Sequence, residues 1–155
     1  MRRTDTTPLS AGTSIGAAGA ALASATAIEI ATETLAQQLA RTAVERDRAG
    51  GHASVERELI RASGLLDLTT PRAYGGAGQS WQLFYRSLRR LAQTDSALAH
   101  LYAFHHLQVA TVLLYGNAQQ HDFFLRPTVA QHLFWGNALN PNDQRTLATE
   151  DGAGW

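Results

Sequence analysis

The sequence predicts a mostly α-helical bundle that forms one domain. Apolar residues recur at spacings of three, four and seven through most of residues 27–132, which is the periodicity of an amphipathic helix. Serine, aspartate and asparagine stand where these segments begin, and glycine stands where several of them end. The 155 residues are 45% hydrophobic, which is enough apolar material to bury a single core.

The first two helices are predicted over residues 27–48 and 54–64. Ile28, Leu35 and Leu39 define the apolar side of the first helix, and the glycine pair at 50–51 ends it, because glycine tolerates a left-handed cap. Ser54 is expected to cap the second helix, which ends at Gly64.

A short connector over residues 65–71 leads to a glycine-rich loop at residues 74–78. The loop lacks the lysine and the following serine or threonine of a phosphate-binding P-loop, so it is interpreted as a turn. Ser80 is expected to cap a third helix, and Asp95 a longer fourth one that ends at Gly116. One face of this fourth helix is predicted to hold Leu98, Leu101, Tyr102, His105, Val109, Val112 and Leu113.

The last helical elements are short and lead into a segment of strand-like sequence. Asn117 and Gln120 fit a capping box for a fifth helix through Phe124, and Pro127 is expected to open a final turn to about His132. Residues 134–138 read as a strand, and residues 147–155 read as a β-segment with a turn. A sheet begun and not closed leaves backbone groups unpaired, so residues 134–155 are interpreted as the beginning of a truncated β-domain.

The first 25 residues allow two interpretations. Arg2 and Arg3 precede a run of small residues, as in a secretory signal peptide. The run contains few large apolar residues to drive insertion, so a flexible leader over residues 1–25 is the favoured interpretation.

Composition excludes several classes of function. Thirteen basic residues, all of them arginine, balance thirteen acidic ones, so there is no basic excess for binding nucleic acid. Without cysteine the chain can form neither disulfides nor thiolate metal ligands. No uninterrupted apolar run of about 18 residues is present, so no membrane span is expected.

Few residues stand out as a candidate site. His100, His105 and His106 are offset by five and six residues on one predicted helix, which does not suit a shared metal ion, so no metal site is expected. The amides of residues 137–142 could bind a polar ligand, and an ordinary Asn/Pro loop is the alternative.

Residues 41–155 resemble the N-terminal helical domain of the acyl-CoA dehydrogenase superfamily, and more closely its dibenzothiophene monooxygenase branch of sulfur-acquisition enzymes. Residues 26–133 would form that domain. The resemblance is carried by Arg41–Gly51, Arg61–Leu66, Pro71–Gly76, Trp81, Asp95–Leu101, His105, Trp135–Ala138 and Thr149–Gly152.

The resemblance implies where a cofactor and a substrate would lie. Phe104 falls where the branch has a tyrosine beside the flavin. His100 and His105 match histidines of the branch, where they would line the substrate pocket and orient neighbours, and packing in the core is the favoured alternative. The implied cofactor-binding loop consists of Asn137, Ala138, Leu139, Asn140, Pro141 and Asn142.

The resemblance also implies an activity and partners. Such enzymes use FMN, reduced by a separate flavin reductase, to oxidise an organosulfur or similar small substrate, and they form cytoplasmic tetramers. A true acyl-CoA dehydrogenase domain with FAD is an alternative, and a non-catalytic helical interaction module is another. Because the β-domain and the C-terminal bundle of the family are missing, this chain is expected to be inactive alone.

Overall fold

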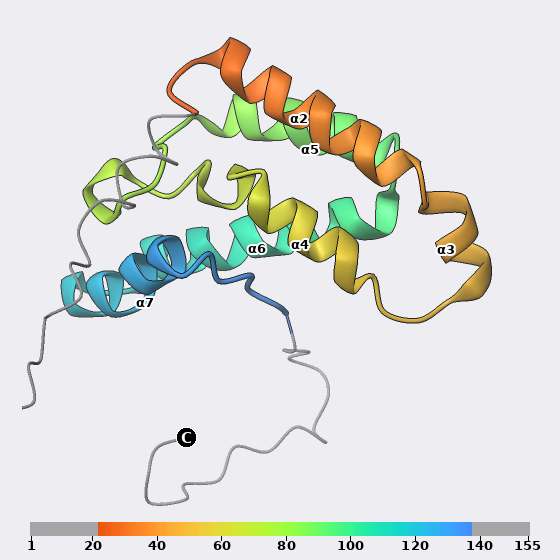
Figure 1. Cartoon of the computed structure of the whole chain (residues 1–155). Helices are drawn as coiled ribbons and strands as arrows, with labels where there is room; N and C mark the ends of the chain where they lie inside the picture. The colour runs from red at the N-terminus through yellow and green to blue at the C-terminus, as the bar shows by residue number, and fades with distance from the viewer. Residues whose placement is uncertain (1–21, 138–155) are drawn as a thin grey trace, which may run out of the picture.

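Six α-helices and two short 3-10 helices make up residues 22–137, the part of the chain described by the structure, which is a computed structural model (Figure 1). The α-helices are α2 (Ala25–Ala40), α3 (Ala43–Ala49), α4 (Ser54–Ala62), α5 (Trp81–Ala92), α6 (Ser96–Tyr115) and α7 (Ala118–Ala130). The 3-10 helices are η1 (Leu65–Asp67) and η2 (Arg72–Tyr74). The predicted mostly helical bundle is confirmed.

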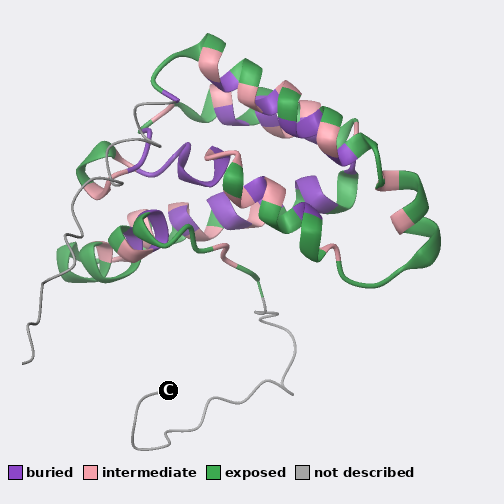
Figure 2. Ribbon diagram, in the orientation of Figure 1, coloured by how far each residue is buried: buried purple, intermediate pink, exposed green. Residues whose placement is uncertain are grey.

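The bundle is built around the contacts of α5 with α2 and α6. In Figure 1, α2 and α5 lie side by side, and α6 runs beneath them with α4 and α7 packed against it. The buried residues lie mainly along the sides of these helices that face one another (Figure 2). The large side chains at the centre of the core include Ile28, Leu35, Leu39, Phe84, Leu91 and Tyr102.

Helix α6 is the central element of the bundle. As predicted, Asp95 caps it by accepting a hydrogen bond from the Leu98 N–H at 3.0 Å. The predicted face is wrong at Leu101, which is 40% exposed. The buried side of α6 includes Ala99 and His106 instead. By length and composition alone α6 could cross a membrane, but in this fold its buried face forms the core of the bundle.

The single helix predicted over residues 27–48 is wrong, because the chain breaks after Ala40 into α2 and α3. The break releases Thr42 to donate a hydrogen bond to Glu56 at 2.7 Å. Beyond it, α3 buries no residue and is held by Arg46, which pairs with Asp95 and Glu56. Beyond Leu39, the chain is therefore held by polar contacts of α3 with α4 and with the cap of α6, and not by a continued apolar stripe.

Two predicted helix starts also differ from the structure. Ser54 is the first residue of α4 rather than its cap, which is Ala53 and contributes no side-chain hydrogen bond. The predicted start at Pro127 is wrong as well, since Pro127 lies inside a continuous α7. Pro127 has no N–H to give to the Phe123 carbonyl, so the backbone of α7 lacks one hydrogen bond at this point. The capping box of Asn117 and Gln120 is confirmed.

The strand predicted at residues 134–138 is not seen in residues 134–137, which the structure describes. The backbone N–H of Trp135 binds the imidazole of His105 at 3.2 Å instead of a neighbouring strand. Residues 1–21 and 138–155 lie outside the described part of the chain. Most of the predicted leader and all of the predicted β-segment over residues 147–155 fall in these two ranges. The division into a leader, a helical domain and a β-domain stays a prediction.

Candidate functional site

Three side chains form a strip along one side of α6. His100, Phe104 and Gln108 follow one another at intervals of four residues, so they lie in a row on the helix surface. The rings of His100 and Phe104 stack, with centroids 4.6 Å apart and planes 28° apart. His100 is exposed and Phe104 is half-buried, so this row faces outward and offers an aromatic surface.

Asn137 joins the same strip from the far end of the described chain. The Gln108 side chain donates a hydrogen bond from Nε2 to Oδ1 of Asn137 at 3.3 Å. Of the residues predicted from sequence, Asn137 thus contacts Gln108, which lies one helical turn after Phe104 on the same side of α6. Gln108 was missed, and its signal in the sequence is its place one helical turn after Phe104. The other members of the predicted loop, residues 138–142, lie outside the described part.

The segment that carries Asn137 is anchored at Trp135. Its backbone N–H binds His105, and its indole Nε1–H donates to the Thr128 hydroxyl at 2.7 Å. The indole also meets the Phe124 ring edge to face, with centroids 5.7 Å apart. These contacts fix the path of the chain from the end of α7 across α6 toward the strip.

The structure places His105 in the core, behind the strip rather than on it. Its Nε2 lies 2.9 Å from the Leu66 carbonyl and must donate there, so Nδ1 is the acceptor for the Trp135 N–H. Burial lowers the pKa of His105 to about 4, which keeps the ring neutral near pH 7. His105 therefore links η1 to the segment that carries Asn137.

His106 is a second buried histidine that the sequence did not single out for a role. It donates from Nε2 to the Leu65 carbonyl at 3.1 Å and accepts from the Thr69 hydroxyl at 2.7 Å. Burial holds the pKa of His106 well below its usual value. Within residues 22–137 no group of three His, Asp or Glu side chains is placed to hold a metal ion.

The glycine-rich loop is a packed turn, as the sequence indicated. Its backbone N–H groups are engaged within the fold: Ala77 donates to the Asp67 carbonyl and Gly78 to the Thr70 carbonyl, both at 2.9 Å. A Cβ atom at Gly76 would lie only 2.1 Å from the Thr70 carbonyl oxygen. The loop thus closes on residues 67–71, and these two donors are unavailable to a phosphate.

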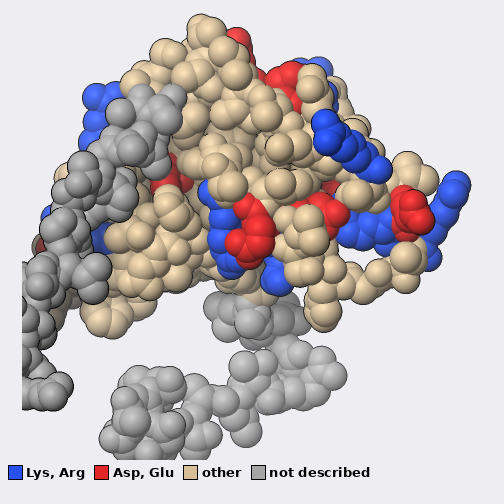
Figure 3. All heavy atoms as spheres, viewed as in Figure 1, with Lys and Arg blue, Asp and Glu red and all other residues tan. Residues whose placement is uncertain are grey.

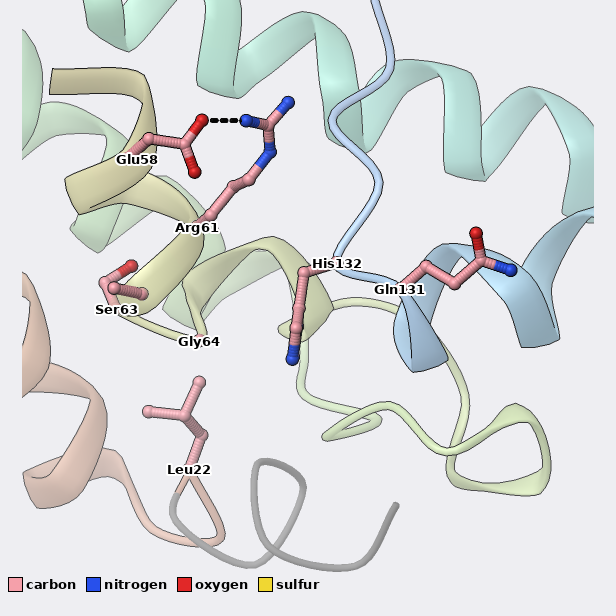
Figure 4. A pocket seen from close by; sticks show the side chains of 8 residues that line it. Leu22, Glu58, Arg61, Ser63, Gly64, Gln131 and His132 are labelled. Carbon is pink, nitrogen blue, oxygen red and sulfur yellow. Dashed lines mark hydrogen bonds and ion pairs between the residues drawn. The ribbon is translucent and has the colours of Figure 1, made fainter. Parts of the chain in front are cut away.

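A separate hollow of about 660 Å³ lies where the ends of α4 and α7 meet (Figure 4). Glu58 and Arg61, which pair with each other, stand on one side of it, and His132 stands on the other. No residue of the strip on α6 lines this hollow. It is therefore separate from the strip to which Asn137 is bonded.

Charge does not gather in one place on the visible surface. On the face shown in Figure 3, arginine and carboxylate side chains lie next to one another. The net charge of +0 agrees with this mixture. A polyanion would find no uniformly basic surface on that face.

Comparison with known proteins identifies relatives of the chain. Residues 15–132 match the family described as acyl-CoA dehydrogenase, N-terminal domain. The chain is 48% identical over 121 residues to a Pseudomonas putida protein described as a probable FMNH2-dependent monooxygenase, SfnC, covering 78% of this chain and 30% of that protein. It is 42% identical over 126 residues to a dibenzothiophene monooxygenase of Rhodococcus erythropolis, covering 76% and 30% of the two chains.

A solved structure agrees with these matches. The methanesulfinate monooxygenase MsuC of Pseudomonas fluorescens superposes with a TM-score of 0.74 at 44% sequence identity, covering 81% of this chain and 32% of that one. The chain thus spans about 30% of the length of the curated relatives it matches.

Proposed function

Because this chain belongs to the family of acyl-CoA dehydrogenase N-terminal domains, we propose that it is the N-terminal helical part of an FMN-dependent monooxygenase that oxidises an organosulfur or similar small substrate. The relatives named as monooxygenases support the reaction class. In the structure, the observation that supports the proposal best is the hydrogen bond to Asn137 from Gln108, which lies one helical turn after Phe104 on α6.

The described residues fit one wall of a flavin site. Phe104 offers the face of a ring against which a planar heterocycle can pack, and Asn137 offers an exposed amide that can hydrogen-bond it. When bound, FMN would activate oxygen and deliver it to the substrate. The chain's own residues would orient the ring system and exclude water on this side.

The strip is an open surface, so it would supply only a minority of the contacts. A ligand of this size needs most of its surface enclosed. The proposal therefore includes the β-domain and C-terminal bundle of the family as the other walls. The chain alone is expected to be inactive.

Partners and location follow from the same proposal. A separate flavin reductase would supply reduced FMN, and the complete enzyme would be a cytoplasmic tetramer like its family. A true acyl-CoA dehydrogenase domain with FAD is the second candidate, which the family match supports but the names of the relatives do not favour. A non-catalytic interaction module is the third.

FMN titration tests the proposal. The 155-residue chain should bind FMN weakly, and its fusion to the part of the Pseudomonas fluorescens enzyme that it does not cover should bind FMN tightly. In the fusion, Asn137→Ala should weaken FMN binding by about 1–3 kcal/mol, because it leaves a buried polar partner unpaired. Phe104→Tyr, which adds a hydroxyl at nearly constant ring size, should retain or improve binding.

Two results would contradict the proposal. One is tight FMN binding by the 155-residue chain alone, which would mean that the other walls are not needed. The other is unchanged binding in the Asn137→Ala fusion, which would remove this residue from the site and leave the fold assignment standing.

A further inference from the structure

We propose that His105 is a positioning residue for the flavin site: it holds the backbone N–H of Trp135 and thereby places Asn137, two residues further on, against α6. This inference rests on the proposed function, since it concerns how the fold presents Asn137 there. His105 itself is 0% exposed, so it acts through the segment that it holds and not by touching the flavin.

The two hydrogen bonds of His105 can each run in one direction only. A backbone N–H can only donate, and a backbone carbonyl can only accept. Nδ1 of His105 lies 3.2 Å from the Trp135 nitrogen, and Nε2 lies 2.9 Å from the Leu66 carbonyl oxygen. The ring is therefore neutral with its proton on Nε2, and burial, which lowers the pKa of His105 to about 4, keeps it neutral near pH 7. The Leu66 bond thus fixes the orientation of the ring that accepts from Trp135.

The anchor at Trp135 is held from two helices. Its backbone N–H binds His105 on α6, and its indole N–H donates to the Thr128 hydroxyl on α7 at 2.7 Å. That hydroxyl donates in turn to the Phe124 carbonyl at 2.7 Å. Phe134, the residue before the anchor, meets the His105 ring edge to face with centroids 5.7 Å apart. Both N–H groups of Trp135 are therefore engaged with the body of the bundle.

This anchor limits where Asn137 can lie. Two residues of fully extended chain span at most about 7 Å, so Asn137 stays near Trp135 whatever conformation Gly136 adopts. At the far end of this segment, the side-chain amides of Asn137 and Gln108 are 3.3 Å apart. His105 and Gln108 are three residues apart on α6, a rise of about 4.5 Å along the helix axis. The segment can therefore follow α6 from one residue to the other, and His105 fixes the buried end of this path.

Two substitutions separate the two bonds of His105. The amide oxygen of an asparagine can take the place of Nδ1, and the amide nitrogen of a glutamine can take the place of Nε2. His105→Asn can therefore keep the bond from Trp135 while it loses the bond to Leu66, and His105→Gln does the reverse. Each variant loses one buried hydrogen bond, so a purely structural role would affect the two alike.

The first arm of the test uses the 155-residue chain without ligand. Hydrogen exchange of the Trp135 backbone amide is followed by NMR in wild type and in both His105 variants. This amide should exchange roughly ten-fold faster in His105→Gln than in His105→Asn, because only the glutamine variant leaves it without an acceptor. The internal control is the Gln120 amide, which is held by Asn117 on α7 and should exchange alike in the two variants.

The second arm measures FMN affinity in the fusion protein described above, at a temperature at which both variants are folded. His105→Asn should bind FMN nearly as well as wild type, whereas His105→Gln should bind it roughly three- to ten-fold more weakly. A second pair of variants tests the same anchor from α7. Thr128→Val removes the acceptor of the Trp135 indole and should weaken FMN binding, whereas Thr128→Ser keeps a hydroxyl and should not.

The outcomes separate this inference from the function on which it rests. If Asn137→Ala weakens FMN binding but the two His105 variants bind FMN equally, the positioning role is wrong and the site survives. Equal exchange of the Trp135 amide in the two variants would also overturn the positioning role. If the His105 variants do not fold, equal FMN affinity of Thr128→Val and Thr128→Ser overturns it instead. If Asn137→Ala has no effect, the proposed site fails and this inference fails with it.

Discussion

Nδ1 of His132 lies 3.6 Å from Oδ2 of Asp67, a carboxylate that is only 1% exposed. Within the described residues, neither oxygen of that carboxylate accepts a hydrogen bond. His132 has φ of 49° and occupies the left-handed position after α7, where glycine is usual. Bonds from His132 N–H to the Val129 carbonyl and from Leu133 N–H to the Thr128 carbonyl complete this turn, which begins the path to Asn137.

The Asp67 carboxyl should make folding stability fall as pH rises, which is the reverse of the usual effect of a carboxylate. Burial raises the pKa of Asp67 to about 6, although His132 opposes the shift. A folded pKa above the unfolded one contributes stability that is present below about pH 4 and is lost as pH rises through about 6. Asp67→Asn should therefore have little effect at pH 4 and should stabilise the protein by about 1–3 kcal/mol at pH 7.

Urea unfolding at the two pH values measures this difference. Asp122→Asn is the matched control, since Asp122 is exposed and pairs with Arg126 on the surface of α7. An Asp67→Asn effect that is equal at pH 4 and pH 7 would show that burial does not perturb the carboxyl.

His105 should act on stability in the opposite direction. Burial lowers its pKa to about 4, so its contribution is fully present above about pH 6.5 and is lost as pH falls toward 4. His105→Leu should cost about 2–4 kcal/mol at pH 7, because it leaves the Leu66 carbonyl and the Trp135 N–H without their partner.

Imidazole ¹⁵N shifts and unfolding curves check both statements about His105. At pH 5.5 the ring should still be neutral and should carry its proton on Nε2. A ring that titrates near pH 6.5, or a His105→Leu protein as stable as wild type, would contradict the core role.

Gly76 should not tolerate any side chain. A Cβ atom there would lie 2.1 Å from the Thr70 carbonyl oxygen, so the backbone of the glycine loop would have to move. Gly76→Ala should destabilise the protein by about 3 kcal/mol or more, in the range of severe single substitutions.

The control for this change is Gly136→Ala, which meets nothing within 4 Å and should be nearly neutral. Thermal unfolding of the two variants compares them directly. Equal melting temperatures would mean that the loop adapts to a side chain at Gly76.

Exposed apolar side chains on α6 and α7 should make the chain associate. Leu107 is 51% exposed on α6, and Phe123 is 71% exposed on α7. Exposed apolar groups of this size are typical of surfaces that another protein part covers. The chain should therefore self-associate in sedimentation and bind a hydrophobic dye, and the double variant Leu107→Ser/Phe123→Ser should do both less. A monodisperse wild-type monomer that binds no dye would contradict this prediction.

Much of the bundle could be predicted because its signals are local. The Ser80 cap of α5, the Asp95 cap of α6 and the capping box at Asn117 each depend on residues three apart in the chain. The break at Thr42 could not be predicted, because its partner Glu56 belongs to another helix. The burial of His106 rather than Leu101 likewise depends on how α6 is rotated against η1.

The candidate site divides in the same way. By itself the sequence determined the helical class, the turn at the glycine loop and the motifs that mark Phe104 and Asn137. Periodicity, capping and motifs depend on residues that are close together in the chain, so they can be recognised without the structure. Only the tertiary structure decided that Gln108 joins Asn137 to the strip, that His105 lies behind it, and that Asp67 is buried beside His132. Each of these pairs is far apart in the chain, and its contact exists only after packing has oriented the helices that carry it.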